Sequence, residues 1–143
     1  MFNMKNFKFR YLIVSLLLIL TISTGCFFKQ KKLNCSGNID LGNTKINNEY
    51  NFTYKKDKIN KIELVSTFDC KSEYGKKVYE SYIDKYKSIK NINIEINKEE
   101  CLIEISTKKI NEKVLNELNF GFLEDTSFNE AKKNLNDTQY ICK

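Results

Sequence analysis

Beyond residue 34, apolar residues recur at two different spacings, and this change of period limits the fold more than any other feature. Tyr50, Phe52 and Tyr54 alternate with polar residues, and a period of two returns at 59–69, 91–97 and 101–107. That spacing predicts half-buried strands. Residues 72–90 instead repeat apolar side chains every three or four positions, which predicts an amphipathic helix. Interleaved patterns of this kind predict a sheet with a helix packed over its apolar face.

Polar residues at 55–58 and 98–100 separate neighbouring strands, so each pair is expected to form a β-hairpin. Weaker patterns predict an earlier strand at 35–42, short helices at 111–118 and 128–135, and a last strand at 138–142. We therefore predict a single α+β domain over 35–143. Its antiparallel sheet has five or six strands, with one long helix and one or two short helices packed on one face.

The long helix is expected to begin after Ser72, a good N-cap residue. Its predicted apolar stripe consists of Tyr74, Val78, Tyr79, Tyr82, Ile83, Tyr86 and Ile89. Burial of this stripe against the sheet is expected to supply much of the stability, at about 25 cal/mol per Å² of apolar surface.

The first 26 residues have the composition of an export signal. Residues 1–10 carry Lys5, Lys8 and Arg10 and no acidic residue, residues 11–22 form an apolar run of 12, and small residues precede Cys26. The run is shorter than the about 20 residues that span a bilayer comfortably. We therefore expect residues 1–25 to be a cleaved signal peptide. An uncleaved N-terminal anchor, with Cys26 uninvolved, is the alternative.

The segment Ser23-Thr24-Gly25-Cys26 resembles the lipobox of bacterial lipoproteins, with Ser23 where that motif usually has an aliphatic residue. The resemblance implies cleavage between Gly25 and Cys26 and a diacylglyceryl group on the Cys26 sulfur. Two acyl chains anchor a protein stably, since each buried methylene contributes about 0.8 kcal/mol. The expected location is the extracytoplasmic face of the cell membrane, with residues 26–34 as a lipidated tether.

Four further cysteines, Cys35, Cys70, Cys101 and Cys142, lie in the predicted domain. An even number in an exported domain favours two disulfides, although three pairings exist. We prefer Cys35–Cys142, because domain termini often lie close together, and Cys70–Cys101, because both continue the apolar faces of strands. Free buried thiols are the main alternative. A four-thiolate zinc site or a redox pair would normally show C-x-x-C spacing, which is absent.

Composition excludes several classes of activity. The chain has no histidine, so Ser–His and Cys–His nucleophile pairs are impossible. The net charge of +6 comes from residues 1–10 and from Lys29, Lys31 and Lys32, which leaves residues 33–143 balanced. A nucleic-acid-binding domain needs a basic face on the fold itself, so no nucleic-acid partner is expected. We expect no metal and no cofactor, and a monomer.

Several segments of the domain resemble the YehR-like lipoproteins, a family of small lipoproteins of unknown function. The resemblance rests on the Gly25-Cys26 signal, FTYKKDKINKIELVSTFD at 52–69, YIDKYKSIK at 82–90, and the strands INIEI and CLIEIS that follow. It implies an α+β lipoprotein domain and carries no catalytic motif.

Three kinds of function are compatible with these observations, the third being a structural or inhibitory role in maintenance of the cell envelope. The first is a non-enzymatic binding or interaction module with a cell-envelope protein as partner. Exposed tyrosines would contact that partner, with Tyr50, Tyr54, Tyr79 and Tyr140 as candidates, although their periodicity is more typical of core residues. The alternative is a small envelope hydrolase that uses paired carboxylates. Its candidate carboxylates are Glu95, Glu99, Glu100, Glu104, Glu124 and Asp125.

Overall fold

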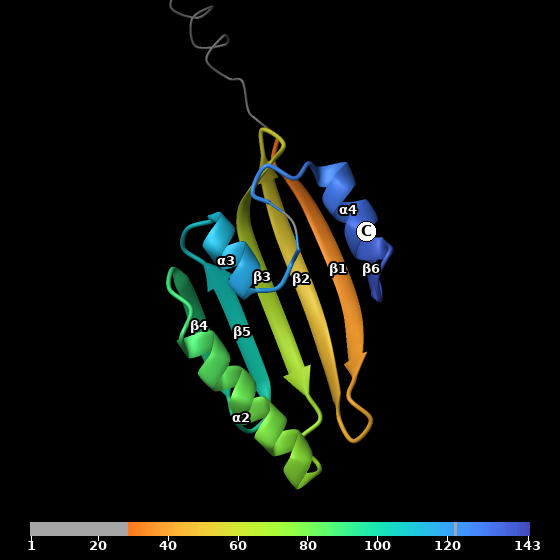
Figure 1. Cartoon of the computed structure of the whole chain (residues 1–143), viewed down its shortest axis with the longest axis vertical. Helices are drawn as coiled ribbons and strands as arrows, with labels where there is room; N and C mark the ends of the chain where they lie inside the picture. The colour runs from red at the N-terminus through yellow and green to blue at the C-terminus, as the bar shows by residue number, and fades with distance from the viewer. Residues whose placement is uncertain (1–28, 122) are drawn as a thin grey trace, which may run out of the picture.

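The computed structural model describes residues 29–121 and 123–143, and within them it has a six-stranded antiparallel sheet and three helices (Figure 1). The strands are β1 (Lys31–Asp40), β2 (Lys45–Lys55), β3 (Lys58–Phe68), β4 (Ile92–Asn97), β5 (Leu102–Thr107) and β6 (Tyr140–Cys142). The helices are α2 (Glu73–Lys87), α3 (Glu112–Glu117) and α4 (Phe128–Asn136). The predicted α+β class and the order of its elements are confirmed.

The strands follow the order β4-β5-β3-β2-β1-β6. Both predicted hairpins form, as β2–β3 and β4–β5. After β3 the chain forms α2 and then the β4–β5 hairpin. The second strand of this hairpin, β5, pairs with β3. This connection leaves β4 at one edge of the sheet, while the short β6 pairs with β1 at the other edge.

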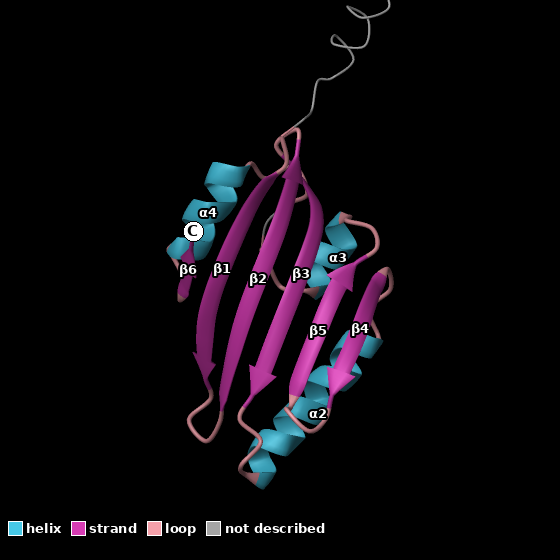
Figure 2. Ribbon diagram, turned by 180° about the vertical axis from the view of Figure 1, so that it is seen from behind, coloured by secondary structure: helices cyan, strands magenta, loops and turns pink. Residues whose placement is uncertain are grey.

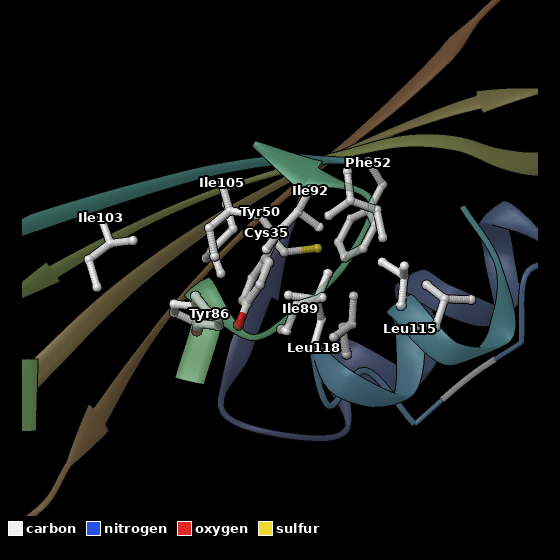
Figure 3. Close-up of a cluster of buried hydrophobic side chains, with 14 of the residues drawn as sticks. Cys35, Tyr50, Phe52, Tyr86, Ile89, Ile92, Ile103, Ile105, Leu115 and Leu118 are labelled. Atoms are coloured by element: carbon white, nitrogen blue, oxygen red, sulfur yellow. The ribbon is translucent and has the colours of Figure 1, made fainter. Parts of the chain in front are cut away.

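The helices cover one face of the sheet, and the view from behind shows the strands of the other face uncovered (Figure 2). Alternation explains the difference, because successive side chains of a strand point to opposite faces. In β2 the covered face carries Ile46, Asn48, Tyr50, Phe52 and Tyr54, all buried. Figure 3 shows Phe52 of the sheet facing Leu115 of α3, while Ile105 lies on the side of Tyr86 of α2.

The β2–β3 hairpin contains one irregularity that the alternation does not predict. Its register shifts between Thr53 and Tyr54, which face Lys61 and Ile59, so Asn60 is an extra residue. This bulge lets Ile59 and Ile62 both be buried on the covered face although they lie three residues apart.

Helix α2 begins as predicted, because the Ser72 side chain accepts a hydrogen bond from the Gly75 amide at 3.0 Å. Of the predicted stripe, Tyr79, Ile83, Tyr86 and Ile89 are buried and Val78 and Tyr82 are partly buried against the core, whereas Tyr74 is 47% exposed. Gly75 approaches the sheet instead, and a Cβ atom there would overlap the carbonyl oxygen of Asp69. The first helical turn therefore lies too close to the β3 end to hold a side chain at this point.

Strand β1 begins at Lys31, earlier than the predicted strand at 35–42. The last four residues of the segment 26–34, which we expected to be tether, are thus paired with β2, and Leu33 is fully buried. This start was not predicted, because the two basic residues Lys31 and Lys32 are typical of a polar linker.

Candidate functional site

The predicted processing site lies outside the described residues. Gly25 and Cys26, the residues of the expected cleavage and lipidation, therefore stay predictions from the sequence. Among the residues that the structure describes, no helix is long and apolar enough to cross a membrane.

Both preferred disulfides are present. Cys35 and Cys142 are direct cross-strand partners in β1 and β6, with Cα atoms 4.0 Å apart. The neighbouring pair Asn34 and Lys143 exchanges both backbone hydrogen bonds, at 3.2 and 2.8 Å. The cysteines therefore form a non-hydrogen-bonded pair, in which side chains of an antiparallel ladder come closest. Both are buried, so the bond joins the first and last strands inside the core.

The second disulfide, Cys70–Cys101, connects two turns at the same end of the sheet. Cys70 follows β3, and Cys101 lies between β4 and β5 with a left-handed backbone (φ 49°). The Phe68 amide also donates to the Cys101 carbonyl at 2.9 Å. Both cysteines are partly exposed, and their bond fixes the β4–β5 hairpin to the end of β3.

Two of the candidate carboxylates come together on the uncovered face of the sheet. Glu95 of β4 and Glu104 of β5 are direct register partners. They border an open hollow of about 280 Å³ together with Glu63, which forms an ion pair with Lys61. Directly opposed like charges destabilise a sheet slightly, so this pair is a feature that packing alone does not favour.

The other candidate carboxylates lie elsewhere. The backbone amides of Glu99 and Glu100 donate to the Asn97 side-chain oxygen at 3.1 and 3.2 Å, which fixes the β4–β5 turn. Glu124 accepts a hydrogen bond at its carbonyl from the Ile59 amide at 3.3 Å, and both Glu124 and Asp125 are exposed. The sequence therefore offered six candidates, and the fold joins two of them.

A groove runs between helix α2 and the edge strand β4, with a volume of about 320 Å³. Its apolar floor includes Tyr79 and Ile83 from the helix and Ile96 from the strand. The Tyr79 hydroxyl donates to the Asn97 carbonyl at 3.1 Å, so the helix is fixed against the end of β4. The charged residues along this groove are Lys76, Glu80, Asp84, Lys87 and Lys98.

The backbone of β4 beside this groove has one free side. The Lys108 amide donates to the Asn91 carbonyl at 2.8 Å, which marks Asn91 and Lys108 as a hydrogen-bonded pair. Such pairs alternate along an antiparallel ladder, so Asn93, Glu95 and Asn97 bond to β5. The N–H and C=O groups of Ile92, Ile94 and Ile96 point away from β5, and no strand of the described chain pairs with them.

No group of three or more His, Cys, Asp or Glu side chains among the described residues is arranged to hold a metal ion. No protein-family model, curated protein or solved structure matches the chain. The resemblance to YehR-like lipoproteins thus stays a prediction, and the function is argued from the geometry alone.

The tyrosines proposed as partner contacts are mostly core residues. Tyr50, Tyr54 and Tyr79 are between 1% and 7% exposed, and only Tyr140 is half-buried. The Tyr50 and Tyr140 hydroxyls lie 3.5 Å apart, and burial, together with this neighbour, raises the pKa of Tyr50. Burial also raises the pKa of Tyr54 to about 12. The periodicity had indicated this outcome.

The groove itself was missed at the sequence level. The stripe of α2 and the alternation in β4 were both visible, but strand order depends on contacts between distant segments. One signal was present: β4 reads INIEIN, without the lysine or proline that commonly protects an edge strand.

Proposed function

We propose that this chain is a lipid-anchored protein on the extracytoplasmic face of the cell membrane, and that its domain is a non-enzymatic binding module. The observation that carries the location is the pairing of all four domain cysteines in two disulfides. Disulfides persist in oxidising compartments outside the cytosol, and this agrees with the export signal read from residues 1–26. Cys26 is the only cysteine left over, as a lipidation site requires.

The binding role is supported by the surfaces around β4. An apolar groove lies beside a free strand edge, and the sheet face behind it is not covered by a helix. A protein partner from the cell envelope is the occupant that such surfaces favour. The resemblance to YehR-like lipoproteins agrees with the proposed location and names no activity.

Processing tests the location. We expect the wild-type chain, expressed in a bacterium that makes lipoproteins, to fractionate with membranes and to begin at Cys26 with a diacylglyceryl mass. Cys26→Ser is expected to stay unprocessed or to leave the membrane, whereas Thr24→Ser, which keeps a small residue, is expected to behave as wild type. A wild-type chain that begins at Met1 and carries no lipid refutes the proposal.

A paired-carboxylate hydrolase is the second candidate, and the opposition of Glu95 and Glu104 favours it. Cα atoms in such a hydrogen-bonded pair lie about 5.5 Å apart, so both carboxylates can reach one glycosidic group. The test is release of reducing ends from cell-wall glycan. Glu104→Gln must abolish release while Glu99→Gln, in the nearby turn, retains it. No release by the wild type excludes this activity on that substrate.

A further inference from the structure

We propose that the β4 edge binds an extended peptide of a partner protein as an additional antiparallel strand, whose alternate side chains enter the α2–β4 groove. This inference rests on the proposed binding role and names the partner's chemistry. Strand addition to a free sheet edge is a common mode of peptide recognition, in which main-chain hydrogen bonds give affinity and pockets give specificity.

The backbone of β4 determines the form of the partner. Three residues, Ile92, Ile94 and Ile96, direct their N–H and C=O groups to the free edge. Only an extended backbone satisfies such a row, because donors and acceptors repeat at every second residue. A six-residue strand therefore offers six hydrogen bonds to an antiparallel partner.

The side chains determine its sequence pattern. Ile94 and Ile96 are half-buried on the covered face, and Ile96 lines the groove together with Ile83 of α2. Residues opposite each other in a ladder share a face, so every second partner side chain lies over these isoleucines and inside the groove. Apolar residues at alternate positions bury the most apolar surface there.

The charges favour one flank of the partner. Helix α2 and β4 are antiparallel, and Tyr79 bonds to Asn97, so Lys76 and Lys98 lie at the end of the groove where β4 ends. An antiparallel partner begins at that end. Acidic residues just before its alternating segment therefore complement the two lysines.

The hydrogen-bonding pattern gives a test that leaves the protein unchanged. The probe is a dye-labelled peptide, Asp-Glu-Val-Thr-Val-Thr-Val, titrated against the purified full chain in detergent by fluorescence anisotropy. In the proposed arrangement each Val lies opposite a β4 isoleucine, so the Val residues both enter the groove and form the hydrogen bonds. N-methylation of the Val residues is expected to weaken binding about tenfold or more, and N-methylation of the Thr residues to leave it nearly unchanged.

A protein variant provides the second arm. Ile96→Lys places a charge at the groove floor of the edge strand and is expected to weaken binding about tenfold or more. The control is Ile141→Lys in β6, the opposite edge strand, where Ile141 is 68% exposed. Circular dichroism confirms that both variants are folded. A folded Ile96→Lys variant that binds like wild type overturns the proposal.

Three further results overturn it. One is equal weakening of binding by N-methylation of the Val residues and of the Thr residues. Another is no binding of the probe peptide by the folded wild type. The third is a dimer, detected by sedimentation, that is lost in Ile96→Lys but is not dissociated by the peptide. In that case β4 pairs with a second copy of the chain. None of these measurements depends on Cys26. If a correctly lipidated chain fails them, peptide binding at the β4 edge is refuted and the proposed location on the membrane still stands.

Discussion

Removal of the Cys35–Cys142 disulfide is expected to destabilise the domain more than removal of Cys70–Cys101. The two bonds close loops with sequence separations of 107 and 31 residues. In the chain-entropy model these loops correspond to stabilisations of about 5 and about 4 kcal/mol at 25 °C. Cys35 and Cys142 are also buried, so their replacement by alanine removes packed sulfur atoms, whereas the second pair is partly exposed. The longer loop and the deeper burial both make the loss of Cys35–Cys142 the more destabilising change.

The assay is urea unfolding of the double variants Cys35→Ala/Cys142→Ala and Cys70→Ala/Cys101→Ala beside the wild type. We expect the first variant to lose the larger free energy of unfolding, and hydrogen exchange to show the three-residue β6 losing protection first. Mass spectrometry after alkylation, with and without reductant, counts the bonds in the wild type. A loss below about 1 kcal/mol for the first pair, or a larger loss for the second, contradicts the loop-length reasoning.

Two further variants test the packing. Gly75→Ala is expected to lower the free energy of unfolding by about 1–3 kcal/mol through overlap with the Asp69 carbonyl, although alanine is the better helix former by about 1 kcal/mol. Ser81→Ala, on the exposed side of α2, is the control. A higher free energy of unfolding for Gly75→Ala would show that the turn relaxes to accept the methyl group. The Tyr54 hydroxyl is buried without a hydrogen-bond partner in the described part of the chain, so Tyr54→Phe is expected to raise the free energy of unfolding by up to about 1 kcal/mol at pH 8. Because the folded-state pKa of Tyr54 is raised to about 12 from 10.0, wild-type stability falls as pH rises from 10 to 12. Urea titrations in that range should show a shallower fall for Tyr54→Phe, and parallel curves would refute the assignment.

Local patterns predicted the elements well because each depends on neighbours in the sequence. The alternation at Ile92, Ile94 and Ile96 and the stripe through Tyr79 and Ile83 gave the β4 strand and the α2 helix with nearly correct limits. The disulfide pairing was also predicted, since it followed from the position of the cysteines on strand faces and at the domain ends.

Features that depend on distant contacts were not predictable in this way. The edge position of β4 follows from the pairing of β5 with β3, which no local period encodes. The bulge at Asn60 moves Ile59 to the covered face against the alternation. The closeness of Glu95 and Glu104 likewise required the hairpin register, and their residue types alone gave no reason to select them from six carboxylates.

The bond between the first and last strands also determines how the domain responds to mechanical tension. A force applied between Lys31 and Lys143 passes along β1 to Cys35, across the two sulfur atoms, and out through Cys142. The chain between these cysteines, which includes all of β2, β3, β4 and β5, lies outside this path and is not stretched. Pulled from its ends, the oxidised domain should extend by only a few residues, and the long extension typical of an unfolding domain should appear only after reduction.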